Sequence, residues 1–162
     1  GPKETDLKTQ VKNLGLEEKI LFVGGQSRSD LSRYYATADI FIGPSIVAEG
    51  GDTEGQPAAF IEAMASKTAI IASDVGGIKD MVKNQETGLL IHQKDPKAIT
   101  KAITSLCKDS VLKQQLEQNA KEHIIKFFRW QAVAEQYMVI YENIDKSLEQ
   151  SPPSLPSTIR LF

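Results

Sequence analysis

With 162 residues, 41% of them hydrophobic and 25% charged, the chain has the size and composition of one globular domain with its own core. Its 19 basic and 21 acidic side chains give a net charge of −2, which argues against nucleic-acid binding, and its apolar runs are too short to cross a bilayer. One cysteine cannot form an internal disulfide, and two widely separated histidines offer no metal site. We therefore expect a protein that is cytoplasmic or peripheral to the membrane, without metal or cofactor.

Helical and strand-like patterns alternate from the amino terminus. Apolar side chains recur at helical spacing over residues 7–14, and Gly15 is placed to end that helix in the left-handed conformation. Residues 19–23 (KILFV) then read as a strand. Ser27–Asp30 resembles a capping box and predicts the start of the next helix.

Three further short apolar runs predict strands at residues 40–42, 69–72 and 89–91. Runs this short and continuously apolar are typical of a parallel sheet that is covered on both faces. Strands that alternate with helices indicate a doubly wound α/β fold, in which ligands bind beyond the carboxyl ends of the strands. The loops that follow these strands are therefore the expected place for a site.

The carboxyl-terminal third is predicted to be helical. Asp95–Pro96 supplies a cap and a first-turn proline for one helix, in which Cys107 is expected to be a core residue. Two more helices are expected over residues 111–125 and 131–148. We expect one domain over residues 1–146 and a proline-rich tail over 147–162.

The glycine-rich loop between Pro44 and Pro57 is the most informative segment. A helix is expected to open with Pro57 at its first position, since proline has no amide hydrogen to leave unpaired there. The free amides from Ala58 to Phe60 would then point outward at the positive end of the helix dipole. This arrangement suits a phosphate group.

Two glutamates bracket this helix start. Glu54 precedes the helix and Glu62 lies on it, so their carboxylates are expected roughly 10 Å apart at a rise of about 1.5 Å per residue. Glycosidase pairs lie closer, at about 5 Å for retention and up to about 9.5 Å for inversion. The spacing instead fits one extended ligand held at both ends. Taken singly, a glutamate on a helix is usually solvated, and one in a loop is often a cap.

Other phosphate-binding motifs are incomplete. The glycines from Gly50 to Gly55 have Walker-like spacing, but Gln56–Pro57 stands where the lysine and the serine or threonine are needed. No strand is followed by Gly-x-Gly-x-x-Gly, so the dinucleotide fingerprint is missing too.

The motifs around this loop resemble a known family. Pro44–Ser45, Glu54-Gly55-x-Pro57, Glu62-Ala63-Met64-Ala65 and Ser73-Asp74-Val75-Gly76-Gly77 are similar, in order, to the carboxyl-terminal donor-binding domain of family 4 retaining glycosyltransferases (glycosyl transferases group 1). The resemblance implies a GT-B fold, of which this would be the Rossmann-like carboxyl-terminal half. It also implies transfer of a sugar from a nucleotide diphosphosugar without a bound metal.

The resemblance assigns roles to individual positions. Glu54 would contact the transferred sugar and is the implied catalytic residue, while Glu62 would bind the nucleotide ribose. The donor sugar and diphosphate would lie along the backbone of Gln56, Pro57 and Ala58. Further implied donor-binding residues are Ser45 and Gly55, with Gly24, Gly25 and Gln26 beside the nucleobase.

This sequence also departs from the family pattern. Lys67 stands where the family usually has glycine, so a strained backbone with positive φ is expected there. The match begins at Gly1–Pro2, after the family's first two strands and the cations that grip the diphosphate. The acceptor-binding domain would precede those strands. We therefore expect the isolated chain to be inactive.

The implied function is donor binding in a retaining glycosyltransferase of polysaccharide or glycoconjugate synthesis. The donor would be a UDP-, GDP- or ADP-sugar, and a saccharide or lipid-linked acceptor would bind through the absent amino-terminal domain. One alternative is a non-catalytic module that binds a nucleotide or a partner chain. Another is a different GT-B enzyme, such as a sugar-nucleotide epimerase or a phosphorylase.

Overall fold

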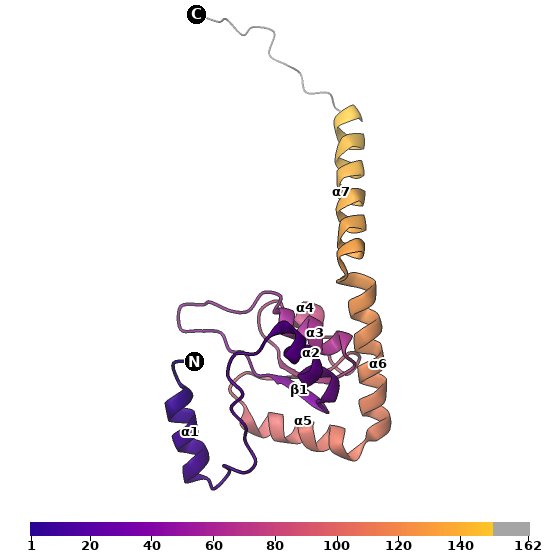
Figure 1. Cartoon of the computed structure of the whole chain (residues 1–162). Helices are drawn as coiled ribbons and strands as arrows, with labels where there is room; N and C mark the ends of the chain where they lie inside the picture. Colours follow the sequence, from indigo (N-terminus) through magenta and orange to yellow (C-terminus); the bar gives the residue numbers. More distant parts are fainter. Residues whose placement is uncertain (151–162) are drawn as a thin grey trace, which may run out of the picture.

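The computed structural model describes the backbone of residues 1–150 and the side chains of residues 1–146. Within the described part, strands and helices alternate through the centre and helices follow at the carboxyl-terminal end (Figure 1). The elements are α1 (Glu4–Asn13), α2 (Arg28–Thr37), β1 (Ile40–Gly43), α3 (Ala58–Ala65), β2 (Ala69–Ser73), α4 (Ile78–Met81), β3 (Leu89–Ile91), α5 (Pro96–Lys108), α6 (Ser110–Phe127) and α7 (Trp130–Gln150).

The three strands form one parallel sheet in the order β1-β2-β3. Ile40 pairs with Ala69 across the first ladder, and Ile71 pairs with Leu89 across the second. These are the strands predicted at 40–42, 69–72 and 89–91, so the α/β class with a parallel sheet is confirmed.

The core lies on both faces of β2, whose five residues are all buried. Ile70 and Ala72 face one apolar cluster, which α3, α4 and the second half of α6 complete. Ala69 and Ile71 face a second cluster, which α5 and the first half of α6 complete. The alternation explains why this strand reads as continuously apolar, since neither of its faces meets water.

The strand predicted at residues 19–23 is wrong. This segment has no regular structure, and Leu21 is 81% exposed. No described strand lies beside residues 19–23, so their backbone has no ladder to join.

Helix α1 has the predicted end but no place in the core. Gly15 adopts a φ of +64°, and its amide donates to the Lys12 carbonyl at 3.0 Å. None of the residues of α1 is buried. The helix lies apart from the sheet in Figure 1.

The other predicted caps are confirmed. The Ser27 side chain accepts a hydrogen bond from the Asp30 amide at 3.2 Å, and Asp95 accepts one from the Ala98 amide at 3.0 Å. A further cap, for which there was no prediction, is Asp109, which ends α5 and whose side chain accepts from the Leu112 amide at 2.9 Å at the start of α6. Each cap satisfies an amide that the helix itself leaves unpaired.

The core position predicted for Cys107 is wrong, because its thiol is free and exposed. Helix α5 buries Ala102 and Leu106. Successive helical residues are about 100° apart, so the residue after Leu106 turns away from the sheet.

Helix α7 extends beyond the sheet as a long projection (Figure 1). It buries Ala132 and leaves large apolar side chains exposed, among them Trp130 at 90%. Among the described helices, none combines the length and apolar content that a membrane span requires. The boundary proposed at residue 146 falls inside this helix, and the rest of the predicted tail, 151–162, lies outside the described residues.

Candidate functional site

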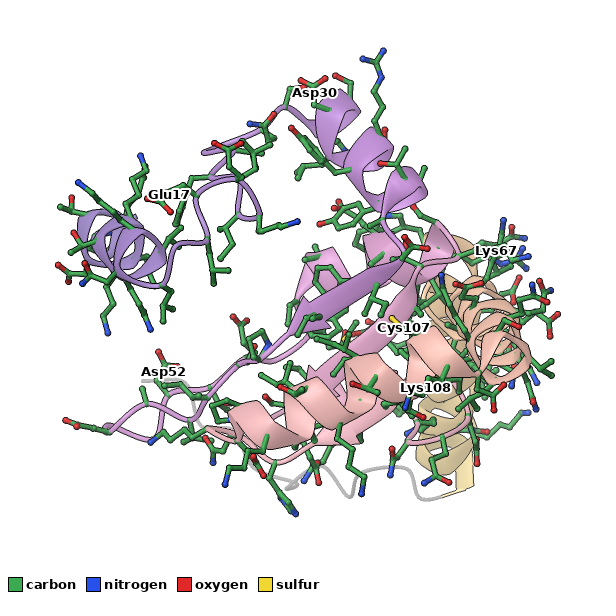
Figure 2. The ribbon with its side chains drawn as sticks, turned by 90° about the horizontal axis from the view of Figure 1, so that it is seen from below. Glu17, Asp30, Asp52, Lys67, Cys107 and Lys108 are labelled. Carbon is green, nitrogen blue, oxygen red and sulfur yellow. The ribbon has the colours of Figure 1, made fainter. Side chains whose placement is uncertain are left out.

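The loops that follow the three strands meet at the carboxyl-terminal edge of the sheet. The Val47 amide, after β1, donates to the Gln93 side chain, after β3, at 2.9 Å. The Asp74 amide, after β2, donates to the Ile91 carbonyl at 2.9 Å. Figure 2 shows Asp52 in the loop at this edge and Lys67 at the opposite end of the sheet. The edge is where a doubly wound sheet binds ligands.

The start of α3 lies at this edge, one residue later than predicted. Pro57 is the cap residue, with φ −65° and ψ 123°, and Ala58 is the first helical residue. The Phe60 amide donates to the Pro57 carbonyl at 3.1 Å, so it is not one of the free amides. The amides of Ala58 and Ala59 precede the intrahelical hydrogen bonds, which leaves them suited to an anion.

The loop before α3 is fixed by the turn after β2. The Gly77 amide donates to the Glu54 carbonyl at 3.0 Å. A Cβ at Gly76 or Gly77 would collide with the backbone oxygen of Glu54 or Gly55, so only glycine permits this approach. The turn therefore packs closely against this loop, and it holds the backbone of the predicted catalytic residue.

Glu62 lies on the side of α3 that faces α2. It is half-buried and lines a pocket of about 230 Å³. Tyr35 from α2 lines the same pocket. Burial raises the pKa of the Tyr35 phenol, and the charge of the Glu62 carboxylate and side-chain hydrogen bonding with it raise that pKa further. The phenol therefore keeps its proton and lines the same pocket as the Glu62 carboxylate.

The remaining predicted residues lie in other surroundings. Gly24 and Gly25 line a pocket of about 760 Å³ beside the start of α1, whereas Gln26 lines a separate pocket of about 310 Å³ with residues of α2. The Gln26 side-chain amide donates to the Val23 carbonyl. Gln56 is exposed, yet it lines a pocket of about 430 Å³ with aromatic residues from α6 and α7. Ser45 lies two residues beyond the end of β1 and is half-buried.

The structure thus groups the predicted residues only in part. The predicted residues from Glu54 to Pro57 are consecutive in the loop that leads into α3. Ala58 and Glu62 lie on α3 itself. Residues 24–26 line pockets that Glu62 does not share. Within the described part of the chain, no group of three or more histidine, cysteine or acidic side chains could hold a metal ion.

The side chains that α2 adds beside Glu62 were not predicted from the sequence. Arg28, Ser32 and Tyr35 all come from this helix and line the Glu62 pocket. A signal for Tyr35 was present, because Leu31 and Tyr35 are four residues apart and so share one helical face. Nothing in the sequence indicated that this face would turn toward Glu62.

Comparison with known proteins identifies a family for this fold. The family model described as "Glycosyl transferases group 1" matches residues 1–123, which include both glutamates. A D-inositol 3-phosphate glycosyltransferase from Corynebacterium glutamicum is 33% identical over 153 residues, covering 90% of this chain and 35% of the relative. A lipopolysaccharide core biosynthesis mannosyltransferase, LpcC, from Rhizobium leguminosarum is 30% identical over 138 residues, covering 85% of this chain and 37% of the relative.

Solved structures share the fold. Sucrose-phosphate synthase from Thermosynechococcus elongatus superposes with a TM-score of 0.73 at 30% identity, covering 91% of this chain and 35% of that one. HepE from Anabaena, crystallised with UDP-glucose, gives a TM-score of 0.74 at 19% identity, covering 86% of this chain and 36% of that one. The curated relatives named above are longer proteins, of which this chain spans between 35% and 37%.

Proposed function

Because the chain belongs to the glycosyl transferases group 1 family, we propose that it is the donor-binding part of a retaining glycosyltransferase. In this proposal a sugar passes from a nucleotide diphosphosugar to an acceptor hydroxyl in polysaccharide or glycoconjugate synthesis. The donor is a UDP-, GDP- or ADP-sugar. HepE, crystallised with UDP-glucose, has the same fold, which is compatible with this class of donor.

The observation that carries the proposal is the place of Glu62 beside the start of α3. A half-buried carboxylate in a pocket can accept hydrogen bonds from ribose hydroxyls. The amides of Ala58 and Ala59 lie about one helical turn away and suit the diphosphate. The ligand would then extend toward Glu54.

The proposed roles of the other predicted residues follow from this position of Glu62. Glu54 would orient the transferred sugar, with its backbone held by Gly77. The backbone of Gly55, Gln56 and Pro57 would line the path of the diphosphate, and Ser45 would lie beside it. The proposed nucleobase contacts are Gly24, Gly25 and Gln26. Helix-terminal amides would stabilise the leaving diphosphate, so the reaction needs no metal ion from this chain.

We also propose that the chain does not transfer sugar by itself. Residues 1–146 would form the donor domain, and the acceptor would bind to a domain outside this sequence. The extent of the match supports this proposal, because the chain spans about a third of each of the relatives. Sugar transfer by the isolated chain would contradict it.

Replacing Glu62 with alanine tests the donor site. We expect Glu62→Ala to weaken nucleoside diphosphate binding by about 1.5–3 kcal/mol, or roughly 10- to 150-fold in Kd, because a hydrogen-bonded charge is lost. Titration calorimetry with UDP, GDP and ADP measures the effect. Glu135→Ala on α7 removes the same charge at an exposed position and should leave the affinity unchanged. Equal affinities for Glu62→Ala and the unsubstituted chain would refute the ribose role.

A further inference from the structure

The pocket beside Glu62 is lined by residues of two helices that β1 and a long loop separate in the sequence. Tyr35 comes from α2 and Glu62 from α3, and both face the same cavity of about 230 Å³. The other residues that line it are Arg28, Ser32, Ala65 and Ser66. Ala65 is small and Ser32 is exposed, so the carboxylate can be approached from outside.

Tyr35 is held in place from two directions. Its ring packs edge-on against Phe41, with centroids 5.9 Å apart, and Phe41 packs edge-on against the buried Phe60. Its carbonyl accepts a hydrogen bond of 2.7 Å from the hydroxyl of Thr68, which is itself buried. A tyrosine has few rotatable bonds, so these contacts fix the position of the phenol oxygen.

Glu62 has more freedom than Tyr35. Its side chain has three rotatable bonds, and a solvated glutamate loses much of that freedom when it binds a ligand. A donor already fixed beside the carboxylate would limit these rotations before the ligand arrives. The pKa of Tyr35, raised by burial and by Glu62, keeps the phenol protonated and able to donate.

We propose that Tyr35 is a positioning residue, whose hydroxyl orients the Glu62 carboxylate toward the vicinal hydroxyls of a nucleotide ribose. One carboxylate oxygen then accepts from the phenol and the other remains open to the ligand. This role rests on the proposed function, since it requires that Glu62 bind the ribose. The phenol itself touches no reacting atom.

The test compares nucleotides with and without the ribose hydroxyls. We expect Tyr35→Phe to raise the Kd for UDP about 3- to 10-fold, the loss of one orienting hydrogen bond, and to leave the Kd for 2′,3′-dideoxy-UDP unchanged. GDP and ADP are measured in parallel with their dideoxy forms. Tyr141→Phe, an exposed tyrosine of α7 that lines neither this pocket nor those of residues 24–26, is the matched control and should alter neither Kd.

Glu62→Ala and Tyr35→Phe together distinguish a failure of the proposed function from a failure of the positioning role. Glu62→Ala should abolish the preference for the ribonucleotide over the dideoxy form. If that preference persists, or if the unsubstituted chain binds no nucleotide, the proposed function fails. If Glu62→Ala behaves as expected but Tyr35→Phe weakens both ligands equally or neither, the positioning role is overturned.

A second measurement leaves Tyr35 in place. The pKa of the phenol, followed by NMR of labelled tyrosine, should fall in Glu62→Gln, because the neighbouring negative charge is removed. An unchanged pKa would show that the two side chains do not interact, and would overturn the proposal without any change to the aromatic core.

Discussion

Lys67 follows α3 in a left-handed conformation, with φ 60°. The Thr68 amide donates to the Ala63 carbonyl at 3.1 Å and the Lys67 amide to the Met64 carbonyl at 3.2 Å, which is a Schellman motif. This conformation costs a residue with a Cβ about 1–2 kcal/mol. At the same position after α1 the chain has Gly15.

Lys67→Gly is therefore expected to raise the free energy of unfolding by about 1 kcal/mol, since the strain is removed while the unfolded chain gains some entropy. Denaturant unfolding measures the change. Lys67→Ala keeps the Cβ and should bring no gain. Identical stabilities for the two variants would show that the backbone here is not strained.

At the scale of single residues, the sequence predicted conformation better than burial. The positive φ of Lys67 was expected from a resemblance to sequences with glycine there, and the prediction is confirmed. Cys107 and Pro57 were misplaced by one position. A helical pattern defines a face only to within one residue, and the packing against β2 decides which neighbour turns inward.

At the scale of elements, α6 contains an unpaired buried group. The His123 ring packs at a tilt against Phe127 and Phe128, with ring centroids 5.0 and 5.7 Å away, and its Nε2 is buried without a hydrogen-bond partner among the described residues. Burial lowers the pKa of His123 below its ordinary value of 6.5. Lys83 and Lys126 lower it further, while Glu86 opposes them.

The sign of the resulting pH dependence follows from linkage. Above pH 6.5 the imidazole is neutral in both states, so it imposes no penalty. As the pH falls below 6.5, the unfolded chain binds a proton that the folded chain does not, and stability is lost until the lower folded pKa is reached.

We expect His123→Phe to reduce the loss of melting temperature between pH 8 and pH 5, because the titrating group is gone and the aromatic contacts remain. The melting temperatures of the two forms at both pH values provide the measurement. The control is His92→Phe, at an exposed position, which should keep the original pH dependence. A pH dependence unaltered by His123→Phe would exclude His123 as its source.

Strand prediction succeeded or failed according to what lies beside each segment. Residues 19–23 and β2 have similarly apolar sequences, yet only β2 is paired on both sides. An apolar run favours a strand, but the run forms one only if another strand lies beside it to accept and donate backbone hydrogen bonds. The sequence of the run does not show whether such a strand is present. Glu54 and Glu62 could be proposed as a pair from the sequence because they lie on one continuous segment, whereas Tyr35 reaches the Glu62 pocket from α2.

At the scale of the whole molecule, the core and the amino-terminal segment differ in how far their residues are buried. Residues of α1 are not buried, whereas every residue of β2 is. Amides in α1 are therefore expected to exchange hydrogen through local opening, and those of β2 only through global unfolding. Hydrogen exchange followed by mass spectrometry should show much lower protection over residues 4–13 than over 69–73. Equal protection of the two segments would show that α1 is part of the cooperative unit.

Helix α6 contributes to the apolar clusters on both faces of the sheet and so couples their unfolding. Leu116 belongs to the cluster under α5, while Ala120 and Ile124 belong to the cluster under α3 and α4. Because one helix passes through both, neither cluster can melt while the other stays intact unless α6 breaks in the middle. On heating, the sheet and its flanking helices should therefore unfold in a single two-state step. The Glu62 pocket should be lost in that same step and not at a lower temperature.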